Sequence, residues 1–249
     1  MRPVALITGA SAGIGEAFAK ALAPTHDLVL VARRADRLEA IARGLQGNHR
    51  VVPADLSDPH APEAIARAVG DIDMLVNNAG TGVYDPFVES DVDTTIQTMA
   101  LNMAAPTLLT RAFLPGMVER KRGAVINVAS LAAYLPLPYG AVYGATKAYL
   151  LSFSEALAEE LNGTGVKVLC VCPGAVETEM QQYSKVRPEV HALGQPVSAE
   201  QVAKQALFAL SMGERVSIAG LHNQVAASLA PFAPRPFTNA IAGWLFGPR

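Results

Sequence analysis

Charged residues are scarce in this sequence, and basic residues are not in excess. Only 17% of the 249 residues are charged, and the formal net charge at pH 7 is −2. Nucleic-acid binding depends on a basic surface that neutralises phosphates, so this balance excludes that function. The chain also carries 51% hydrophobic residues. This proportion excludes a disordered chain and favours a globular α/β protein with a large core.

Cysteine is almost absent. The only cysteines are Cys170 and Cys172, which lie two positions apart in an apolar run. That spacing places both thiols on one face of a strand, where a disulfide would be strained. We therefore expect two buried, reduced core thiols rather than a redox site, and we expect no metal site.

Long unbroken apolar runs are missing as well. The apolar residues 3–7 are too few for the core of a signal peptide, so we expect a cytoplasmic protein. Residues 221–249 are apolar, but prolines interrupt them too often for a membrane-spanning helix of about 20 residues. For this C-terminal extension we favour an oligomer interface over an interfacial membrane contact or a flap that closes a pocket.

What the sequence does contain is a regular alternation of short apolar runs and helical stretches. Strands that alternate with helices predict right-handed crossovers and a parallel sheet. We expect a doubly wound Rossmann fold, with a seven-stranded parallel sheet and helices on both faces, in a single catalytic domain over residues 1–220. The seven expected strands are Val4–Thr8, Leu28–Ala32, Val51–Ala54, Met74–Asn77, Ala124–Ala129, Val166–Val171 and Val216–Ala219.

Two helical patterns stand out by their length, and one segment by its irregularity. The helices are expected from about Thr94 to Arg120, with an interruption at Pro106, and from Val142 to Asn162. Periodicity fails later in the chain, and we interpret residues 178–197 as a lid over the substrate.

The first predicted strand leads directly into a glycine-rich turn and then into a helical pattern. The turn contains Gly9, Ser11, Gly13, Ile14 and Gly15. Glycines in this context let the backbone approach a pyrophosphate, whose charge is stabilised by the first turn of the helix. A tight turn without any ligand is the alternative.

The end of the second predicted strand indicates which dinucleotide binds. NAD-binding folds place a carboxylate there, whereas this strand ends in Arg33 and Arg34. Guanidinium groups clamp a 2′-phosphate, helped by the Ser11 hydroxyl, so NADP(H) is the predicted cofactor. Solvated loop arginines are the alternative. Asp36 keeps NAD(H) as the less favoured cofactor, although residues 35–38 resemble the capped start of a helix.

A tyrosine and a lysine four residues apart indicate acid–base chemistry. Tyr143 and Lys147 lie on one face of a predicted helix, and an adjacent ammonium lowers the pKa of a phenol toward the working range. The ordinary alternative is a half-buried tyrosine beside a solvated lysine. Ser130 follows a predicted strand, so its hydroxyl either holds a substrate oxygen or caps a turn. Asn102 lies within a predicted helix, where an exposed asparagine is disfavoured, and we interpret it as positioning a water behind Lys147.

These motifs, in this order, resemble the short-chain dehydrogenase/reductase family over nearly the whole chain, in its NADP(H)-preferring form. Further matching segments are Asp55-Leu56, Asn77–Gly80 and Pro173–Thr178. Asn77 either joins the cofactor site or ties its strand to neighbouring elements. The cofactor contacts that the resemblance implies are Asp55 and Leu56 at the adenine, Asn78, Ala79 and Gly80 at the ribose, Pro173, Gly174, Val176 and Thr178 at the nicotinamide, and Tyr143 and Lys147 beside it.

The resemblance also implies an activity and an assembly. It implies hydride transfer between a nicotinamide and a carbonyl or secondary alcohol, with Tyr143 as general acid and base beside Asn102, Ser130 and Lys147, in a homodimer or homotetramer. The expected pocket walls are mostly apolar, which favours a neutral, apolar small molecule. These walls are Tyr84, Leu131, Tyr134, Tyr139, Ala175, Met180 and Tyr183. A non-catalytic NADP(H)-binding or sensing protein and a membrane-surface interaction protein are the alternatives.

Overall fold

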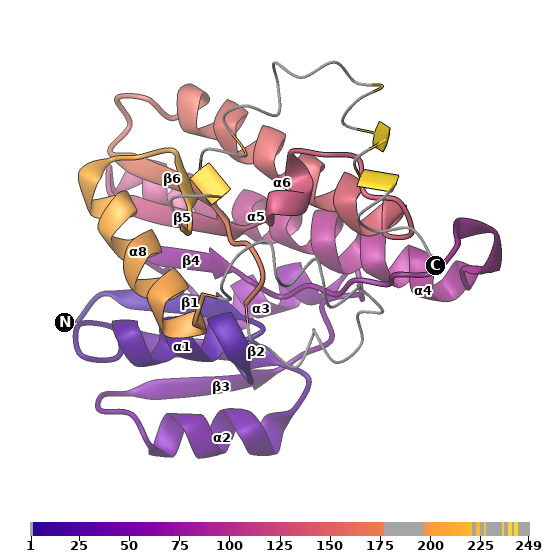
Figure 1. Cartoon of the computed structure of the whole chain (residues 1–249). Coiled ribbons are helices and arrows are strands. Elements are labelled where there is room, and N and C mark those ends of the chain that lie inside the picture. Colours follow the sequence, from indigo (N-terminus) through magenta and orange to yellow (C-terminus); the bar gives the residue numbers. More distant parts are fainter. Residues whose placement is uncertain are drawn as a thin grey trace.

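The computed structural model describes residues 2–176 and 197–220, together with residues 223, 224, 227, 236, 239, 240, 242 and 243. One parallel sheet forms the centre of this described part of the molecule (Figure 1). Its strands stand in the order β3-β2-β1-β4-β5-β6-β7. Their bounds are β1 Val4–Thr8, β2 Asp27–Ala32, β3 His49–Pro53, β4 Met74–Asn77, β5 Gly123–Val128, β6 Val166–Cys172 and β7 Val216–Ile218. The predicted seven-stranded parallel sheet is confirmed.

Helices cover both faces of the sheet, as expected for a doubly wound Rossmann fold. One hydrophobic core lies under α1, α2 and α8, with Phe18 and Val202 among its members. The other lies under α3, α5 and α6 and includes Ile65 and Leu157. Figure 1 shows α1 and α8 side by side. The bounds are α1 Gly13–Leu22, α2 Ala35–Arg43, α3 Ala61–Val69, α4 Val92–Met99, α5 Ala105–Glu119, α6 Ala141–Glu160 and α8 Ala199–Met212.

Strand β1 shows why the apolar runs of this sequence are continuous. Leu6 and Ile7 are neighbours in the chain, and neither side chain is exposed. Leu6 packs in the core under α3, α5 and α6, whereas Ile7 packs in the core under α1, α2 and α8. A strand that is buried on both faces needs an apolar residue at every position, so its sequence shows no alternation.

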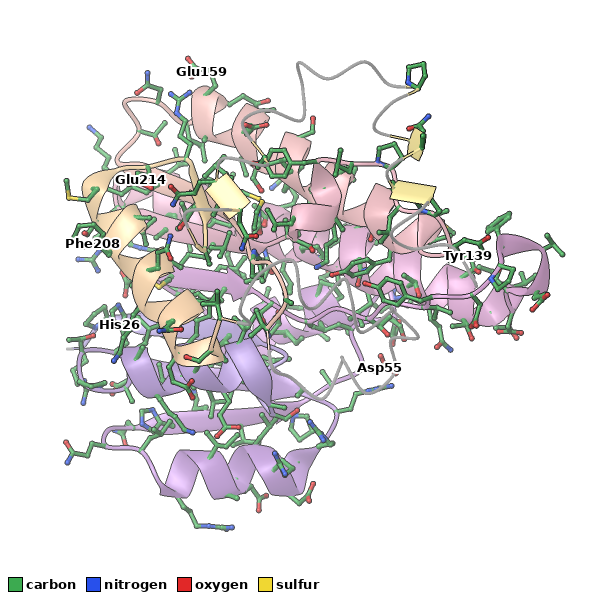
Figure 2. All side chains as sticks on the ribbon, in the orientation of Figure 1. His26, Asp55, Tyr139, Glu159, Phe208 and Glu214 are labelled. Atoms are coloured by element: carbon green, nitrogen blue, oxygen red, sulfur yellow. The ribbon has the colours of Figure 1, made fainter. Side chains whose placement is uncertain are left out.

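The order of the strands reverses at β1, which pairs with β2 on one side and with β4 on the other. Ligands of doubly wound sheets bind at the carboxyl ends of the strands beside such a reversal. Figure 2 shows Asp55, which follows β3, and Tyr139, which precedes α6, on one side of the molecule. His26 and Glu214, which precede β2 and β7, lie on the opposite side. The carboxyl ends of the strands therefore share one side, and the candidate site lies there.

The first long helix departs from its prediction. A π-helical segment, Ala100–Ala104, joins α4 to α5 without a break in the helix. Pro106 lies in the first turn of α5, where the absence of an N–H group is tolerated. The predicted interruption at Pro106 is therefore present as a π-helical turn just before the proline, although the chain stays helical through it.

Candidate active site

The glycine-rich turn lies at the end of β1. Gly9 and Gly13 have φ angles of 64° and 56°, in the left-handed region that favours glycine. A Cβ atom on Gly15 would come within 2.3 Å of the Gly9 carbonyl oxygen. Ala12 precedes α1 and provides no side-chain cap, so the first N–H groups of the helix point to a position that an anion can fill. The turn therefore fits the pyrophosphate of a dinucleotide.

Thr8 connects this turn to the end of β4 by hydrogen bonds. Its buried hydroxyl accepts hydrogen bonds from the backbone N–H groups of Asn78 at 2.9 Å and of Ala79 at 3.0 Å. The Asn78 side-chain amide donates to the Thr8 carbonyl oxygen at 3.0 Å. Asn78 and Ala79 are thus brought beside the glycine turn, which is where a ribose contact requires them. Thr8 directly precedes Gly9 and begins the glycine motif, but the sequence analysis assigns its hydroxyl no role.

A group of arginines follows the carboxyl end of β2 and lies around Ser11. Arg34 donates from Nη2 and Nε to the Ser11 hydroxyl at 3.1 and 3.3 Å. Arg37 donates to the Ser11 carbonyl oxygen at 3.5 Å. Arg33 is exposed in the same loop, and its charge helps to lower the pKa of Asp55, after the hydrogen bonds from Ser57 to that carboxylate. Arg37 is a member of this group that the sequence analysis misses, because it lies within the first turn of α2 and not at the end of β2.

The start of α2 differs in detail from its prediction. The helix begins at Ala35, as expected, and Asp36 lies in its first turn. The preceding residue, Arg34, makes no side-chain cap. The expectation of a capped start is therefore wrong, because the side chain at that position turns to Ser11 instead.

Two predicted cofactor residues also belong to the hydrophobic cores. Leu56 is buried under α3 and α5, and Ile14 packs against the core on the other face of the sheet. Asp55 is exposed beside Leu56, and its Oδ1 accepts hydrogen bonds from the N–H and hydroxyl groups of Ser57. Packing therefore accounts for the apolar side chains at both positions, and their contact with a cofactor stays a prediction.

Tyr143 and Lys147 lie one turn apart on α6, and both are buried. The Lys147 side chain is only 5% exposed, so it is not a solvated lysine. Its Nζ donates to the Val128 carbonyl oxygen at 2.9 Å and lies 5.8 Å from the centroid of the Tyr143 ring. The expected placement of both side chains on one helix face is thus what the structure has.

Burial decides the pKa values of this pair. It lowers the pKa of Lys147 to about 8, a shift that the nearby Cys170 and Cys172 thiols partly oppose. Burial raises the pKa of Tyr143, and a hydrogen bond with the Ser130 side chain opposes that rise. The expected lowering of the Tyr143 pKa by the ammonium is therefore not found. The reason is that both groups are desolvated and the ammonium binds the Val128 carbonyl.

Ser130 caps a turn, which is one of the two roles that the sequence leaves open, and its contact with a substrate oxygen stays a prediction. It follows β5, and its hydroxyl accepts a hydrogen bond from the Ala132 N–H at 3.1 Å, which caps the short 3₁₀ helix Leu131–Ala133. The same side chain is close enough to the Tyr143 phenol to lower its pKa, against the larger effect of burial. The serine is therefore a turn residue that also places a hydroxyl beside the tyrosine.

Asn102 is buried, not exposed as the helix prediction assumes. It lies in the π-helical segment and is 1% exposed. Its Oδ1 accepts from the Thr81 N–H at 2.9 Å, and its Nδ2 donates to the Thr81 carbonyl at 2.8 Å and to the Thr146 hydroxyl at 3.0 Å. The side chain is thus committed to protein partners. The backbone carbonyl of Asn102 has no α-helical donor, because position 106 is a proline without an N–H group.

The loop after β4 lies against the tyrosine. A Cβ atom on Gly82 would be 2.8 Å from the Tyr143 ring, and one on Gly80 would be 3.4 Å from Lys147 Nζ. The ring of Tyr84 packs on that of Tyr143, with 5.6 Å between their centroids and 49° between their planes. Gly82 is therefore a contact of the candidate site that the sequence analysis misses, since nothing in its local pattern marks it.

A cavity of about 260 Å³ opens beside Tyr143. Its wall comes from residues 83–98 and from Tyr139, Ala141, Val142 and Tyr143. Much of this wall is polar, because the first segment contributes carboxylates and hydroxyls. Apolar atoms still make up more than half of the exposed wall, which agrees with the expectation of a mostly apolar pocket. Of the segment 83–98 the sequence analysis places only Tyr84 at the pocket, whereas its neighbours Val83 and Asp85 line this cavity.

The other predicted wall residues lie in different surroundings. Tyr139 lines the cavity, whereas Tyr134 packs on the core that contains Cys170 and Cys172. Leu131 donates its N–H to the Pro173 carbonyl oxygen at 3.0 Å, so it lies beside the predicted nicotinamide segment. Met180 and Tyr183 lie outside the described residues, as do Thr178 and nearly all of the expected lid.

The described part of the predicted nicotinamide segment is closely packed. A Cβ atom on Gly174 would be 2.7 Å from Nδ2 of Asn223. Val176 is buried and pairs with Val197, whose N–H donates to the Ala175 carbonyl oxygen at 3.1 Å. This packing holds the chain after β6 at the carboxyl end of the sheet, close to Leu131.

Two other polar groups are structural. Asn77 Nδ2 donates to Asn127 Oδ1 at 2.8 Å and to the Thr110 hydroxyl at 3.2 Å, so it ties β4 to β5 and α5. Of the two roles considered for Asn77, the structure therefore has the one in which the side chain ties its strand to neighbouring elements. Cys170 and Cys172 are buried free thiols with 3.9 Å between their Sγ atoms, and their placement in the core is confirmed.

The described residues contain neither a metal-binding cluster nor a membrane-spanning helix. These residues hold no group of three or more His, Cys, Asp or Glu side chains arranged to bind a metal ion. Among their helices, none combines the length and the apolar character that crossing a membrane requires.

The fold and this group of side chains define a class of protein, the oxidoreductases built on a doubly wound α/β sheet. Within that class the chain belongs to the short chain dehydrogenase family, whose model matches residues 3–188. The family assignment rests on three quarters of the chain, and it agrees with the resemblance seen in the sequence motifs.

Individual relatives agree with this assignment. A short chain dehydrogenase of Pseudocercospora fijiensis is 40% identical over 186 residues, which cover 71% of this chain and 60% of that protein. The NADP-dependent 3-hydroxy acid dehydrogenase of Schizosaccharomyces pombe is 35% identical over 233 residues, or 86% of this chain and 89% of the relative. The solved structure of a short-chain dehydrogenase from Sphingobium yanoikuyae in complex with NADPH has a TM-score of 0.83 at 33% identity, with 99% of this chain and 96% of that chain covered.

Proposed function

We propose that this oxidoreductase transfers a hydride between NADP(H) and a carbonyl or secondary alcohol group of a neutral small molecule, with Tyr143 as general acid and base. The observation that carries the proposal is the buried group of Ser130, Tyr143 and Lys147, which lies beside a cavity at the carboxyl ends of the strands. A buried phenol beside a serine hydroxyl, with an amine one turn away, is suited to proton transfer at a substrate oxygen.

The choice of NADP(H) rests on the arginines at the end of β2. Arg34 and Arg37 both reach Ser11, and Arg33 is exposed beside them. Guanidinium groups recognise a phosphate with charge-assisted hydrogen bonds, and no carboxylate ends β2 to repel one. The names of the S. pombe relative and of the S. yanoikuyae complex refer to NADP and NADPH. NAD(H) is the less favoured cofactor.

In the direction of reduction, the chain supplies an oxygen site and a proton. The bound nicotinamide supplies the hydride to the carbonyl carbon. Ser130 holds the carbonyl oxygen by a hydrogen bond, and the Tyr143 phenol gives that oxygen its proton. Because burial raises the Tyr143 pKa, the phenol is protonated at neutral pH and has this proton to give.

The proton on Tyr143 must then be replaced. Lys147 lies one turn away, and a pKa of about 8 lets its ammonium lose and regain a proton near neutral pH. The Asn102 backbone carbonyl, which has no α-helical donor, is an acceptor for a water that links Lys147 to solvent. Oxidation of an alcohol is the reverse sequence, in which Tyr143 takes the proton.

The proposed substrate is neutral because of the charges around the cavity. Its wall carries the carboxylates of Asp85, Glu89 and Asp91, and no lysine or arginine is among its described lining residues. An anionic substrate would be repelled at short range. This distinguishes the proposal from the activity that names the S. pombe relative, which is a 3-hydroxy acid dehydrogenase.

We also propose an organisation and an assembly. Residues 1–220 form the catalytic domain, residues 178–197 act as the substrate lid, and residues 221–249 form an apolar extension. A homodimer or homotetramer is supported by exposed apolar side chains that follow one another around the start of α4, namely Phe87, Val88, Val92 and Ile96.

The test is a turnover assay that follows the absorbance of NADPH with acetophenone, cyclohexanone, ethyl acetoacetate and acetoacetate. We expect turnover of neutral ketones, and a loss of about 100-fold or more in Tyr143→Phe. Tyr149→Phe is the matched control, because it removes a hydroxyl from the same helix that is bonded to Thr107 at 2.8 Å. NADPH binding without any turnover would favour the sensing protein, and a preference for acetoacetate would overturn the neutral substrate.

A further inference from the structure

One buried hydroxyl next to the catalytic lysine has no role in the proposed chemistry. Thr146 lies on α6 between Tyr143 and Lys147 and is 1% exposed. Its hydroxyl donates to the Tyr143 carbonyl oxygen at 2.8 Å and accepts from Asn102 Nδ2 at 3.0 Å. A threonine hydroxyl has one proton to donate, and the bond to the Tyr143 carbonyl oxygen uses it.

These bonds connect the helix of the tyrosine to the loop that covers it. The other two hydrogen bonds of the Asn102 amide go to the N–H and carbonyl groups of Thr81. Thr81 lies between Gly80, which approaches Lys147, and Gly82, which approaches the Tyr143 ring. A continuous chain of hydrogen bonds therefore runs from the loop, through Asn102 and Thr146, to the backbone of Tyr143.

We propose that Thr146 is a positioning residue for the reaction: its hydroxyl holds the loop of Gly80–Gly82 and the Tyr143 turn of α6 at a fixed separation. This inference rests on the proposed function of Tyr143. The loop lies so close to the phenol ring that a Cβ atom on Gly82 would be 2.8 Å from it, so a shift of the loop moves or uncovers the ring. Proton transfer depends steeply on such placement.

The key variants are Thr146→Val, which keeps the shape but removes the hydroxyl, and Thr146→Ser, which keeps the hydroxyl. We expect Thr146→Val to lower kcat about 10- to 100-fold with acetophenone, or with the ketone that the wild type reduces fastest. We expect the Kd for NADPH, measured by its fluorescence, to change by less than about twofold, since no bond to the glycine turn is lost. Thr146→Ser is expected to restore most of kcat.

Thr110 provides a matched control. It is 2% exposed, and its hydroxyl accepts from Asn77 Nδ2 at 3.2 Å, so Thr110→Val removes the same kind of buried threonine–asparagine bond on α5. We expect Thr110→Val to lower Tm but to leave kcat close to that of the wild type. Equal losses of kcat in Thr146→Val and Thr110→Val would show a general structural effect and overturn the inference. A Thr146→Ser variant as slow as Thr146→Val would do the same.

A second measurement separates this inference from the proposed function. The ultraviolet titration of the Tyr143 phenol is obtained as the difference between each protein and its version that also carries Tyr143→Phe. We expect Thr146→Val to shift this titration to lower pH, because a loosened loop admits water to a phenol whose burial raises its pKa. If the wild type reduces no ketone, the proposed function fails, while an unshifted titration in Thr146→Val overturns the positioning role.

Discussion

The Lys147 ammonium donates a hydrogen bond to the Val128 carbonyl oxygen at 2.9 Å. Val128 ends β5, and Ser130 follows two residues later, so this bond ties α6 to the strand that carries the candidate serine. Lys147 therefore fixes the spacing between Ser130 and Tyr143 in addition to bringing an amine to the site. Its burial gives it a pKa of about 8, which makes the charge of the site sensitive to pH near neutrality.

The first prediction concerns the pH dependence of ketone reduction. Lys147 is protonated below its pKa of about 8 and loses its proton above it, so kcat for reduction is expected to fall as pH rises through about 8. Lys147→Arg keeps a cation at all accessible pH values and should move this fall to higher pH. Profiles of kcat against pH for both proteins provide the measurement. An unchanged fall in Lys147→Arg would assign it to another group.

The second prediction concerns stability. The pKa of Lys147 is lowered in the folded protein from 10.5 to about 8, so the unfolded chain binds more protons between these two values. Stability relative to Lys147→Met is therefore expected to rise with pH from about 8 to about 10.5, by at most about 1.4 kcal/mol per pH unit. Urea unfolding of both proteins at several pH values measures the difference. A constant difference would contradict the lowered pKa.

The third prediction concerns the cofactor. Arg34→Ala removes the guanidinium that bonds to the Ser11 hydroxyl, and it is expected to raise the KM for NADPH about tenfold. The KM for NADH should change little, because NADH has no 2′-phosphate. Arg43→Ala is the control from the same region, since Arg43 is exposed at the end of α2 and pairs only loosely with Glu39 at 3.9 Å. Equal effects on the two cofactors would remove the 2′-phosphate assignment. Arg33→Ala is expected to show the same discrimination.

The fourth prediction concerns the loop that covers the tyrosine. A Cβ atom at position 82 would lie 2.8 Å from the Tyr143 ring, so Gly82→Ala must displace the ring or the loop. We expect kcat to fall about tenfold or more, with NADPH affinity retained. Gly44→Ala is a suitable control, because the nearest atom to its Cβ would be 3.5 Å away. Full activity in Gly82→Ala would show that the position of the loop is unimportant for the reaction.

The fifth prediction concerns the Asn102 carbonyl. Pro106→Ala introduces an N–H group one helical turn after Asn102, and this group can occupy the carbonyl that we assign to a water. We expect slower proton delivery and hence a several-fold lower kcat, with a Tm at or above that of the wild type. Measurements of kcat and Tm on the same preparation separate the two effects. The control is Pro115→Ala, which replaces a proline later in α5.

Much of the fold can be predicted from the sequence because the central strands β1, β4 and β5 are buried on both faces. Residues such as Leu6 and Ile7 give a continuous apolar run that no solvent-facing strand would tolerate. The glycine turn is also predictable, since Gly9 and Gly13 adopt a backbone conformation that other residues avoid. The spacing of Tyr143 and Lys147 places them on one helix face by the geometry of the helix alone.

The rest depends on contacts between distant segments. Asn102 and Thr146 are far apart in the chain, and their hydrogen bond exists only because α6 packs beside the π-helical segment. The direction of the Tyr143 pKa could not be predicted either, because it depends on burial that local spacing does not reveal. The carboxylates in the cavity wall were missed for the same reason, since the fold brings Asp85 and Asp91 to Tyr139.

The central place of β1 has a consequence for synthesis on the ribosome. This strand is made before every other strand of the sheet, yet it pairs with β4, where Leu6 faces Leu75. Until β4 has left the exit tunnel, one edge of an uncharged and mostly apolar strand has no partner. Nascent chains shorter than this point are therefore expected to need a chaperone, whereas longer ones can bury that edge by themselves.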